Sequence, residues 1–457
     1  MIQASTPRLR AYSAGQLEQI PQLAGIGHEQ RFEMRVVASV LPFRVNDYVC
    51  RELIDWDRVP EDPIFQLVFP QRGMLAAEEF ERMAALHRRG AERGEIDALA
   101  REIRAGLNPH PAGQQALNVP VFDGDRLTGL QHKYRETVLF FPSQGQTCHS
   151  FCTFCFRWAQ FIGDRELKFA ERDATRLHAY LADHREVSDV LVTGGDPMVM
   201  RTKVLRGYLE ALLAPEFDHV RTIRIGSKAL TFWPQRFVSD EDADDLAALF
   251  ERLVRGGKHV AFMAHLEHWR ELETDVAVRA VRRLRDCGVA IRSQAPVLRH
   301  VNDCADTWAR TWREQVQLGI VPYYMFVERD TGARGYFELP LARAHEIYRD
   351  AIKQVSGLAR TARGPSMSCG PGKVEIQGVA EVAGEEVFVL RFIQARDPAW
   401  TNRPFFAKFD PRATWFDELV PAFGEREFFF ESQLREIETV GVRRSEPARG
   451  HAHARSH

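Results

Sequence analysis

From residue 137 onward, short apolar runs alternate with amphipathic stretches. The runs have the length and composition of buried strands; they lie at 137–141, 189–193, 222–225, 259–263, 290–294 and 323–326. The stretches between them have helical periodicity; they lie at 167–182, 203–213, 240–254, 274–286, 306–318 and 341–355. This alternation predicts a parallel sheet with right-handed crossovers. Six units are fewer than the eight of a closed barrel. The predicted fold class is therefore α/β, with a partial (β/α)6 barrel.

The chain before this region has a different pattern. Residues 78–107 carry apolar positions at helical spacing among many charges, with a glycine-bearing interruption at 89–94 that predicts two helices. Residues 62–65, with Asp and Pro, predict a turn. We therefore predict a helical N-terminal region over 1–131, in which 108–131 is a linking segment.

Beyond the barrel, predicted over 132–360, two further regions are expected. Residues 361–442 form a C-terminal α+β extension that is rich in aromatic residues after position 400. These rings are expected to pack in a core or at a subunit contact, with a substrate lid as a further alternative. Residues 443–457, rich in Arg, His, Ser and Gly, predict a disordered tail.

Composition narrows the class of protein. The chain has 457 residues, 45% hydrophobic and 27% charged, with a formal net charge of −2. These values are typical of a globular protein, and the charge indicates no nucleic-acid partner. Seven cysteines, three of them clustered, do not form a secreted disulfide framework. No signal peptide or long apolar run is present, so we predict a cytoplasmic protein without membrane attachment.

The cluster of cysteines follows the first predicted strand. Cys148, Cys152 and Cys155 stand in a Cys-x3-Cys-x2-Cys spacing. Three neighbouring thiolates can hold three irons of a 4Fe–4S cluster and leave the fourth iron open to a small molecule. The alternative is a structural zinc knuckle, for which His149 or a distant cysteine would complete the four ligands. The spacing is the signature of radical S-adenosylmethionine (SAM) enzymes, in which the open iron binds SAM.

Polar and glycine-rich positions follow the later strands. Gly194, Gly195 and Asp196 follow the second strand, and paired glycines allow a ligand to approach the backbone closely. Ser227 follows the third strand, His265 the fourth and Gln294 the fifth. Active groups of such folds gather at the carboxyl ends of strands, so these residues are candidate SAM contacts. Each one singly also fits an ordinary loop residue.

Many short motifs occur in one order over residues 35–400. They include Asp62-Pro-Ile, His132-Lys-Tyr, the cysteine loop, Val192-Thr-Gly-Gly-Asp-Pro197, Ile223-Arg-Ile-Gly226, Pro234-Gln-Arg236, Val301-Asn-Asp303 and Pro322-Tyr-Tyr324. In these motifs the chain resembles the lysine 2,3-aminomutase family of radical SAM enzymes. The resemblance implies a 4Fe–4S cluster, SAM and pyridoxal 5′-phosphate (PLP) as cofactors. It also implies that an amino group migrates between adjacent carbons of an amino acid.

The resemblance also assigns roles to single residues. Lys373 follows Cys369-Gly-Pro-Gly372 and matches the lysine that binds PLP. Such a lysine needs an amine that is partly neutral. Tyr134 and Lys133 match a region that borders PLP. Arg157 matches the arginine that grips the substrate carboxylate, for which a guanidinium fork is suited. Each of the two basic residues Lys373 and Arg157 also fits an ordinary surface or core-edge position.

Three departures from the family pattern affect the prediction. The two aspartates that hold the lysine ammonium are replaced by Arg329 and Ser366 in an alignment without gaps. Two acids flank Arg329. Asp330 could replace the missing aspartate with a shift of one residue, and Glu328 lies on the other side. An arginine that serves PLP is replaced by Thr137. Some members of the family link their subunits through a zinc site that uses C-terminal cysteines. No cysteine follows Cys369 here, so we expect other contacts to hold any homo-oligomer together.

We therefore predict a PLP-dependent radical SAM 2,3-aminomutase whose substrate is not lysine, with glutamate as an example. The alternative is a PLP-independent radical SAM enzyme that modifies an amino acid or a protein side chain. The expected partners are the small-molecule amino acid and a one-electron reductant such as flavodoxin or ferredoxin. A zinc-binding protein without enzymatic activity is the remaining alternative.

Overall fold

The computed structural model describes residues 9–113, 117–162 and 170–445. One mixed sheet of eleven strands runs through it, ordered β5 to β15 with each strand beside its neighbour in the chain. The bounds are β5 Leu130–Tyr134, β6 Thr137–Phe140, β7 Asp189–Val192, β8 Thr222–Ser227, β9 His259–His265, β10 Ala290–Val297, β11 Val321–Val327, β12 Arg363–Ser368, β13 Gly372–Val382, β14 Glu385–Ala395 and β15 Pro404–Lys408.

Strands β6 to β12 pair in parallel, whereas β5 and β13–β15 pair antiparallel at the two edges. The six predicted runs lie on β6 to β11, and the α/β class is confirmed. The sheet also crosses both predicted boundaries of the barrel region, because β5 spans position 131 and β12 pairs with β11. The domain limits stay a prediction.

Helices follow the parallel strands where the sequence predicts them, and residues 167–169 of the first prediction lie outside the described residues. The main helices are α6 Ala174–Asp183, α7 Thr202–Leu209, α10 Ala243–Arg255, α11 Asp275–Asp286, α12 Ala305–Gln317 and α14 Leu341–Lys353. Short helices lie at α8 Ala229–Phe232, α9 Gln235–Val238 and α13 Arg334–Phe337. In α11, the side chain of Thr274 caps the first turn at Ala277 N. Gly288, with a φ of +78°, follows the end of that helix.

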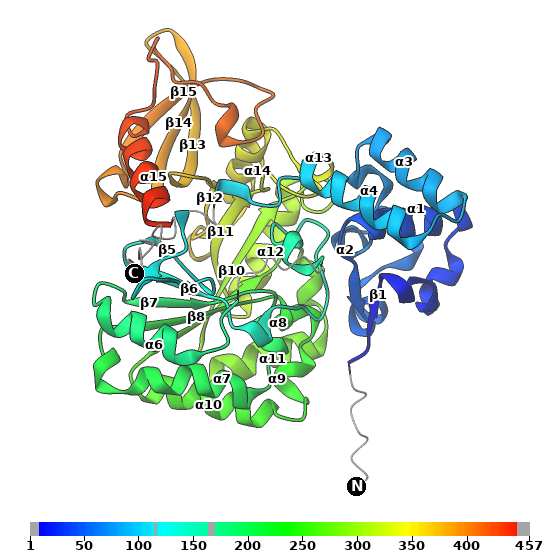
Figure 1. Ribbon diagram of the computed structural model, residues 1–457, viewed down its shortest axis with the longest axis horizontal. Helices are drawn as coiled ribbons and strands as arrows, with labels where there is room; N and C mark the ends of the chain where they lie inside the picture. The colour runs from blue at the N-terminus through cyan, green and yellow to red at the C-terminus, as the bar shows by residue number, and fades with distance from the viewer. Residues whose placement is uncertain (1–8, 114–116, 163–169, 446–457) are drawn as a thin grey trace, which may run out of the picture.

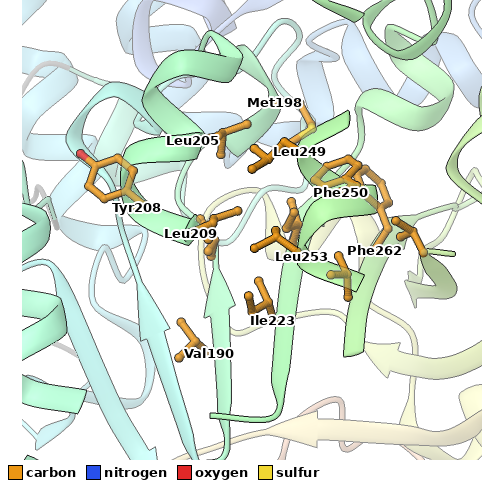
Figure 2. Close-up of a cluster of buried hydrophobic side chains, with 14 of the residues drawn as sticks. Val190, Met198, Leu205, Tyr208, Leu209, Ile223, Leu249, Phe250, Leu253 and Phe262 are labelled. Carbon is orange, nitrogen blue, oxygen red and sulfur yellow. The ribbon is translucent and has the colours of Figure 1, made fainter. Parts of the chain in front are cut away.

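The main hydrophobic core lies between the sheet and these helices. Figure 2 shows Leu205 and Leu209 of α7 and Phe250 of α10 above Ile223 of β8 and Phe262 of β9. Burying one such side chain contributes about 1.5–3 kcal/mol. The cluster therefore fixes the parallel strands against their helices and holds the strand ends in place.

The N-terminal helices form a lobe beside the sheet (Figure 1) with its own hydrophobic cluster. The elements are β1 Ala11–Ser13, α1 His28–Val40, β2 Arg44–Asn46, α2 Pro63–Val68, α3 Ala77–Arg88 and α4 Arg93–Gly106. The predicted pair of helices over 78–107 is confirmed. The turn predicted at 62–65 is wrong, because the Asp62 carboxylate accepts from Ile64 N and Phe65 N and starts α2. A hairpin of β3 Val121–Phe122 and β4 Asp125–Arg126 lies in the linking segment.

The C-terminal strands carry an aromatic core. Buried rings pack against β13–β15; they include Trp400, Phe405, Phe416, Phe428 and Phe430. Core packing is therefore the use of these rings. Helix α15, Glu431–Ser445, reaches the first positions of the predicted tail at 443–445. Residues 446–457 lie outside the described residues, and the tail stays a prediction. None of the helices in the described ranges combines the length and apolar character needed to cross a membrane.

Candidate active site

A cavity of about 330 Å³ opens at the carboxyl ends of the parallel strands. It extends from the cysteine loop, residues 148–155, to the start of β13. The predicted residues that line it are Tyr134, Cys148, Cys152, Cys155, Arg157, Gly194, Gly195, Asp196, Ser227, His265, Gln294, Arg329 and Lys373. Candidates from eight separate parts of the fold thus meet in one site.

The N-terminal lobe holds the cysteine loop in place. Phe151 N donates to Arg44 O at 2.8 Å, and Thr153 N donates to Leu67 O at 2.9 Å. The Thr153 hydroxyl also donates to Gln66 O at 2.7 Å. Backbone groups of a loop without regular structure are therefore paired with β2 and α2.

The three thiols of this loop are free and line the cavity. Burial raises the pKa of Cys148 and Cys152 well above the usual range and raises that of Cys155 as well. Buried thiolates therefore need a compensating cation, and an iron–sulfur cluster supplies one.

Gly194 and Gly195 lie against residues 145–147, directly before the cysteine loop. A Cβ on Gly195 would come within 2.6 Å of Thr147 C and Thr147 N. Gly195 N donates to Gly145 O at 3.0 Å. Their small size brings the β7 loop and the segment before the cysteine loop together at the edge of the cavity. Both glycines line the cavity, and their contact with a ligand stays a prediction.

Asp196 joins three loops. Its carboxylate accepts from the Ser227 hydroxyl at 2.7 and 3.0 Å, from Lys228 N at 3.0 Å and from Met198 N at 2.9 Å. His149 Nε2 lies 3.2 Å from Asp196 Oδ2. Burial acts to raise the pKa of Asp196, but His149 and the hydrogen bonds outweigh it and hold that pKa below its usual value. Both carboxylate oxygens are thus engaged with the protein.

The wall beyond Asp196 combines neutral and ionised groups. His265 Nε2 and Gln294 Nε2 lie 2.9 Å apart at the ends of β9 and β10. Lys228 donates to Glu271 Oε2 at 2.7 Å and to Glu267, and all three side chains are buried. These acids hold the pKa of Lys228 above its usual value although burial acts to lower it. The lysine therefore stays charged beside Cys152.

Arg157 bridges the cysteine loop and the β7 loop. Its Nη1 donates to the Thr193 hydroxyl at 2.7 Å and to Gly194 O at 2.6 Å. The guanidinium also lies 5.2 Å from the ring centroid of Phe141 and 5.0 Å from that of Phe156. Burial lowers the pKa of Arg157 to about 10, which still leaves it cationic at neutral pH. It is placed to bind an anion in the cavity.

Lys373 lies at the other end of the cavity, in β13 rather than in the preceding loop. Its Nζ is 4.0 Å from the ring centroid of Tyr324. Burial, together with the charges of Arg224, Arg363 and Lys133, lowers the pKa of Lys373 to about 7. A substantial fraction of its amine is therefore neutral and nucleophilic at physiological pH.

Other basic and polar side chains surround that lysine. Lys133 Nζ donates to Cys369 O at 2.5 Å, and burial lowers its pKa to about 7. Burial raises the pKa of Tyr134 above its usual value. Thr137 donates its hydroxyl to Asp189 Oδ2 at 3.2 Å, and Arg224 Nε donates to Asp189 Oδ1 at 2.9 Å. Arg224 thus brings a guanidinium to the same wall from β8.

Two predicted substrate contacts have different outcomes. Arg329 lines the cavity, whereas Ser366 does not; its side chain is fully buried, with Oγ 3.5 Å from Met325 O. Ser368, two residues further along β12, lines the cavity instead. Asp330 is not among the lining residues and binds Asn108 Nδ2 at 3.1 Å. Glu328 lines the cavity and is the acid that faces it.

Several lining residues were not assigned roles from the sequence. Lys228 and Arg224 closely follow or lie on a predicted strand, which is the signal that could have identified them. His149, inside the cysteine loop, was considered only as a zinc ligand. Its contact with Asp196 depends on two loops 47 residues apart, and such a distance carries no local pattern.

The residues present fit the groups that the sequence implies. Within the described ranges, no three His, Cys, Asp or Glu side chains gather as a site for a single metal ion. Three thiols that lack a disulfide and a lysine with a pKa of about 7 are donors suited to an iron–sulfur cluster and to PLP, respectively.

Comparison with known proteins gives several relatives named as lysine 2,3-aminomutases. The chain is 32% identical over 409 residues to a "Putative L-lysine 2,3-aminomutase" of Aquifex aeolicus (strain VF5), covering 90% of this chain and 94% of that one. It is 28% identical over 260 residues to an L-lysine 2,3-aminomutase of Escherichia coli (strain K12), covering 56% and 68%. No family model matches the chain.

Among solved structures, a radical SAM methyltransferase from Sphaerobacter thermophilus covers 64% of this chain and 94% of its own, with 14% identity and a TM-score of 0.35. The three-thiol loop at the end of a parallel sheet defines the class as the radical SAM enzymes. Within that class, the chain belongs to the lysine 2,3-aminomutase family.

Proposed function

We propose that the protein is a PLP-dependent radical SAM aminomutase that converts an α-amino acid other than lysine into a β-amino acid. One observation carries the proposal. A single cavity is lined both by the three thiols of the cysteine loop and by a half-buried lysine whose pKa is about 7. The two reactive centres of such a reaction would therefore open onto one substrate volume.

In this proposal, Cys148, Cys152 and Cys155 hold the cluster, and SAM lies along Ser227, His265 and Gln294. When bound, the cluster with SAM supplies a carbon-centred radical, and PLP supplies a carbonyl group that carries the migrating amine. Asp196, saturated by protein donors, keeps the β7, β8 and cysteine loops in register. Gly194 and Gly195 allow the close contact between two of these loops.

Lys373 would hold PLP through its neutral amine. Lys133 and Arg224 line the same wall, and their N–H groups would suit the cofactor's phosphate. Arg224 is also paired with Asp189 at 2.5 Å, which fixes its position. Tyr134, with its raised pKa, stays protonated as a hydrogen-bond donor. Arg224 on β8 offers a guanidinium where Thr137 leaves none on β6, and this compensates for the departure from the family pattern.

Arg157 would bind the substrate carboxylate. Its Nη1 is fixed by Thr193 and Gly194, while its Nη2 has no hydrogen bond among the described residues. Arg329 replaces an acid where the family holds the lysine ammonium, and a second cation repels an ammonium. A side chain with a carboxylate or a neutral polar end, such as that of glutamate, suits this wall better than lysine.

Thr137 also favours the second candidate, a PLP-independent radical SAM enzyme. In that case Lys373 would have no covalent partner. We further propose that the sheet is the partial barrel of the class and that a flavodoxin or ferredoxin supplies the electron. The C-terminal strands are its PLP-lysine extension.

The test uses protein purified and reconstituted without oxygen. Iron and sulfide analysis, SAM cleavage under a strong reductant and the visible absorption of lysine-bound PLP are measured on wild type and Lys373→Ala. We expect cleavage in both proteins and the absorption in wild type alone. Product analysis with lysine and glutamate then tests the substrate. Brisk β-lysine formation would refute the substrate proposal, and colourless protein without SAM cleavage would refute the radical function.

A further inference from the structure

Glu328 is a buried acid with an unused hydrogen-bonding atom. It follows β11 directly, it is 4% exposed and it lines the cavity. Its Oε1 has no hydrogen-bond partner among the described residues. An unpaired buried carboxyl oxygen is costly, so a group that enters the cavity and donates to it would recover that cost.

Arg329, the next residue, has an unused hydrogen-bond donor. Its Nε has no hydrogen-bond partner in the described ranges, and its nearest acidic oxygen is Asp330 Oδ1 at 3.7 Å. The guanidinium lies between the rings of Phe156 and Trp415, at 5.3 and 5.8 Å from their centroids. These rings hold the flat cation in place without using its N–H groups.

The two side chains are not paired with each other. No ion pair within 4 Å joins them in the described part of the chain, although their charges act on one another. An acceptor and a donor on consecutive residues thus follow β11 and belong to side chains that line the same cavity. A ligand group that satisfies both must itself carry a donor and an acceptor.

We propose that Glu328 and Arg329 bind the terminal carboxamide of the substrate side chain, so that the enzyme takes glutamine or its shorter homologue asparagine. This inference rests on the proposed function and narrows its substrate class. The carboxamide oxygen accepts from Arg329, and the carboxamide N–H donates to Glu328. Arg157 remains available for the α-carboxylate.

Charge and hydrogen bonding disfavour the nearest alternatives. An ammonium would meet the Arg329 charge. Burial raises the pKa of Glu328 well above its usual value, which favours its neutral form. A carboxylate has no donor of its own, so it would leave the carbonyl oxygen of this acid unpaired. A carboxamide is neutral and matches the pair in either protonation state of Glu328. The protonated acid accepts through its carbonyl oxygen and also donates its proton, and both functions have counterparts on a primary amide. A site with unpaired buried polar groups also discriminates against substrate analogues that lack the matching hydrogen-bonding groups.

The test measures binding to the holoenzyme under anaerobic conditions by calorimetry with glutamine, glutamate, lysine and norvaline, the last of which lacks the polar end. We expect glutamine to bind at least tenfold more tightly than each of the others. Glu328→Leu and Arg329→Met should each reduce that preference to threefold or less. Glu328→Gln, which keeps a donor and an acceptor, should retain most of the preference for glutamine.

Two controls separate folding from recognition. Glu381→Leu and Arg426→Met change exposed residues of the same types and should keep the preference for glutamine. If Glu328→Leu does not fold, as judged by circular dichroism, the preference for glutamine is tested with Glu328→Gln and Arg329→Met alone. Glutamate binding as tightly as glutamine overturns the inference, and so does a preference that survives Arg329→Met.

Failure of the inference is distinguishable from failure of the proposed function. SAM cleavage and the absorption of lysine-bound PLP are measured on the same preparation. If both are present while glutamine has no advantage, the carboxamide site is wrong and the aminomutase proposal stands. If both are absent while glutamine binds preferentially through Glu328 and Arg329, the recognition is right and the reaction is wrong.

Discussion

The imidazole of His149 lies 3.2 Å from the carboxylate of Asp196, and this contact ties the cysteine loop to the loop after β7. Both side chains are buried. Asn46 of β2 lies 3.3 Å from the other ring nitrogen, so the N-terminal lobe completes the chain of contacts. The position of the three thiols therefore depends on groups from three regions of the sequence.

Replacement of Asp196 by asparagine tests that dependence. Asparagine has one acceptor oxygen in place of two, so at least one of the donors around it loses its partner. The expected cost is about 1–3 kcal/mol of unfolding free energy, together with a loss of about half of the iron per chain. Urea unfolding and iron analysis are the measurements, with exposed Asp245→Asn as the control. Unchanged iron content would count against a role in holding the loop.

Gly195→Ala tests the close contact between the two loops. The added methyl group would meet Thr147 backbone atoms at 2.6 Å, so the loops must separate. We expect reconstitution of the cluster to fall severalfold and the melting temperature to drop by several degrees. Gly207→Ala is a matched control, because a methyl group there meets no atom within 4 Å and lies within α7. Alanine in a helix stabilises it by about 0.5–1 kcal/mol relative to glycine.

The low pKa of Lys373 predicts a pH-dependent stability in the protein without cofactor. Its pKa is about 7 in the folded chain and 10.5 as the ordinary value. Between these values the unfolded chain binds the additional proton, so stability rises with pH and the cost of burial is greatest below pH 7. The free energy of unfolding of Lys373→Met should therefore exceed that of wild type most near pH 6. This difference should shrink toward pH 10. Urea midpoints across this range measure it, and exposed Lys203→Met should give a flat difference.

Arg157→Lys tests the predicted anchor of the substrate carboxylate. Lysine lacks the planar fork that reaches Thr193, Gly194 and a ligand at once. A charge-assisted hydrogen bond contributes about 1.5–3 kcal/mol, which corresponds to a rise in KM of about 10- to 100-fold. Steady-state kinetics with the amino acid that proves to be the substrate measure it, and Arg201→Lys is the exposed control. An unchanged KM with a lower kcat would indicate a role in loop position alone.

Local pattern was sufficient for the strands and helices of the parallel region. The strand predicted at 290–294 is observed as Ala290–Val297, and the helix predicted at 274–286 as Asp275–Asp286. Their periodicity and glycine stops lie within a few residues, so sequence alone carries the signal. The spacing of Cys148, Cys152 and Cys155 likewise predicted one cluster site, and the three side chains line one cavity.

The errors have a common physical cause, which is contact between distant segments. Ser366 was placed by counting along the chain, but Ser368 on the same strand lines the cavity. The glycines after β7 lie against residues 145–147, a contact between distant segments that no local pattern records. The unused oxygen of Glu328 follows from the absence of a neighbour in three dimensions, which no local pattern records.

The continuous sheet from β6 to β13 has a consequence for how far apart the two ends of the cavity can be. The thiol loop follows β6, and Lys373 lies on β13, so an unbroken ladder of backbone hydrogen bonds spans the interval between them. Such a ladder resists stretching, so the sheet itself sets this separation. In the proposed reaction, the distance between the two reactive centres would therefore be the same for every substrate.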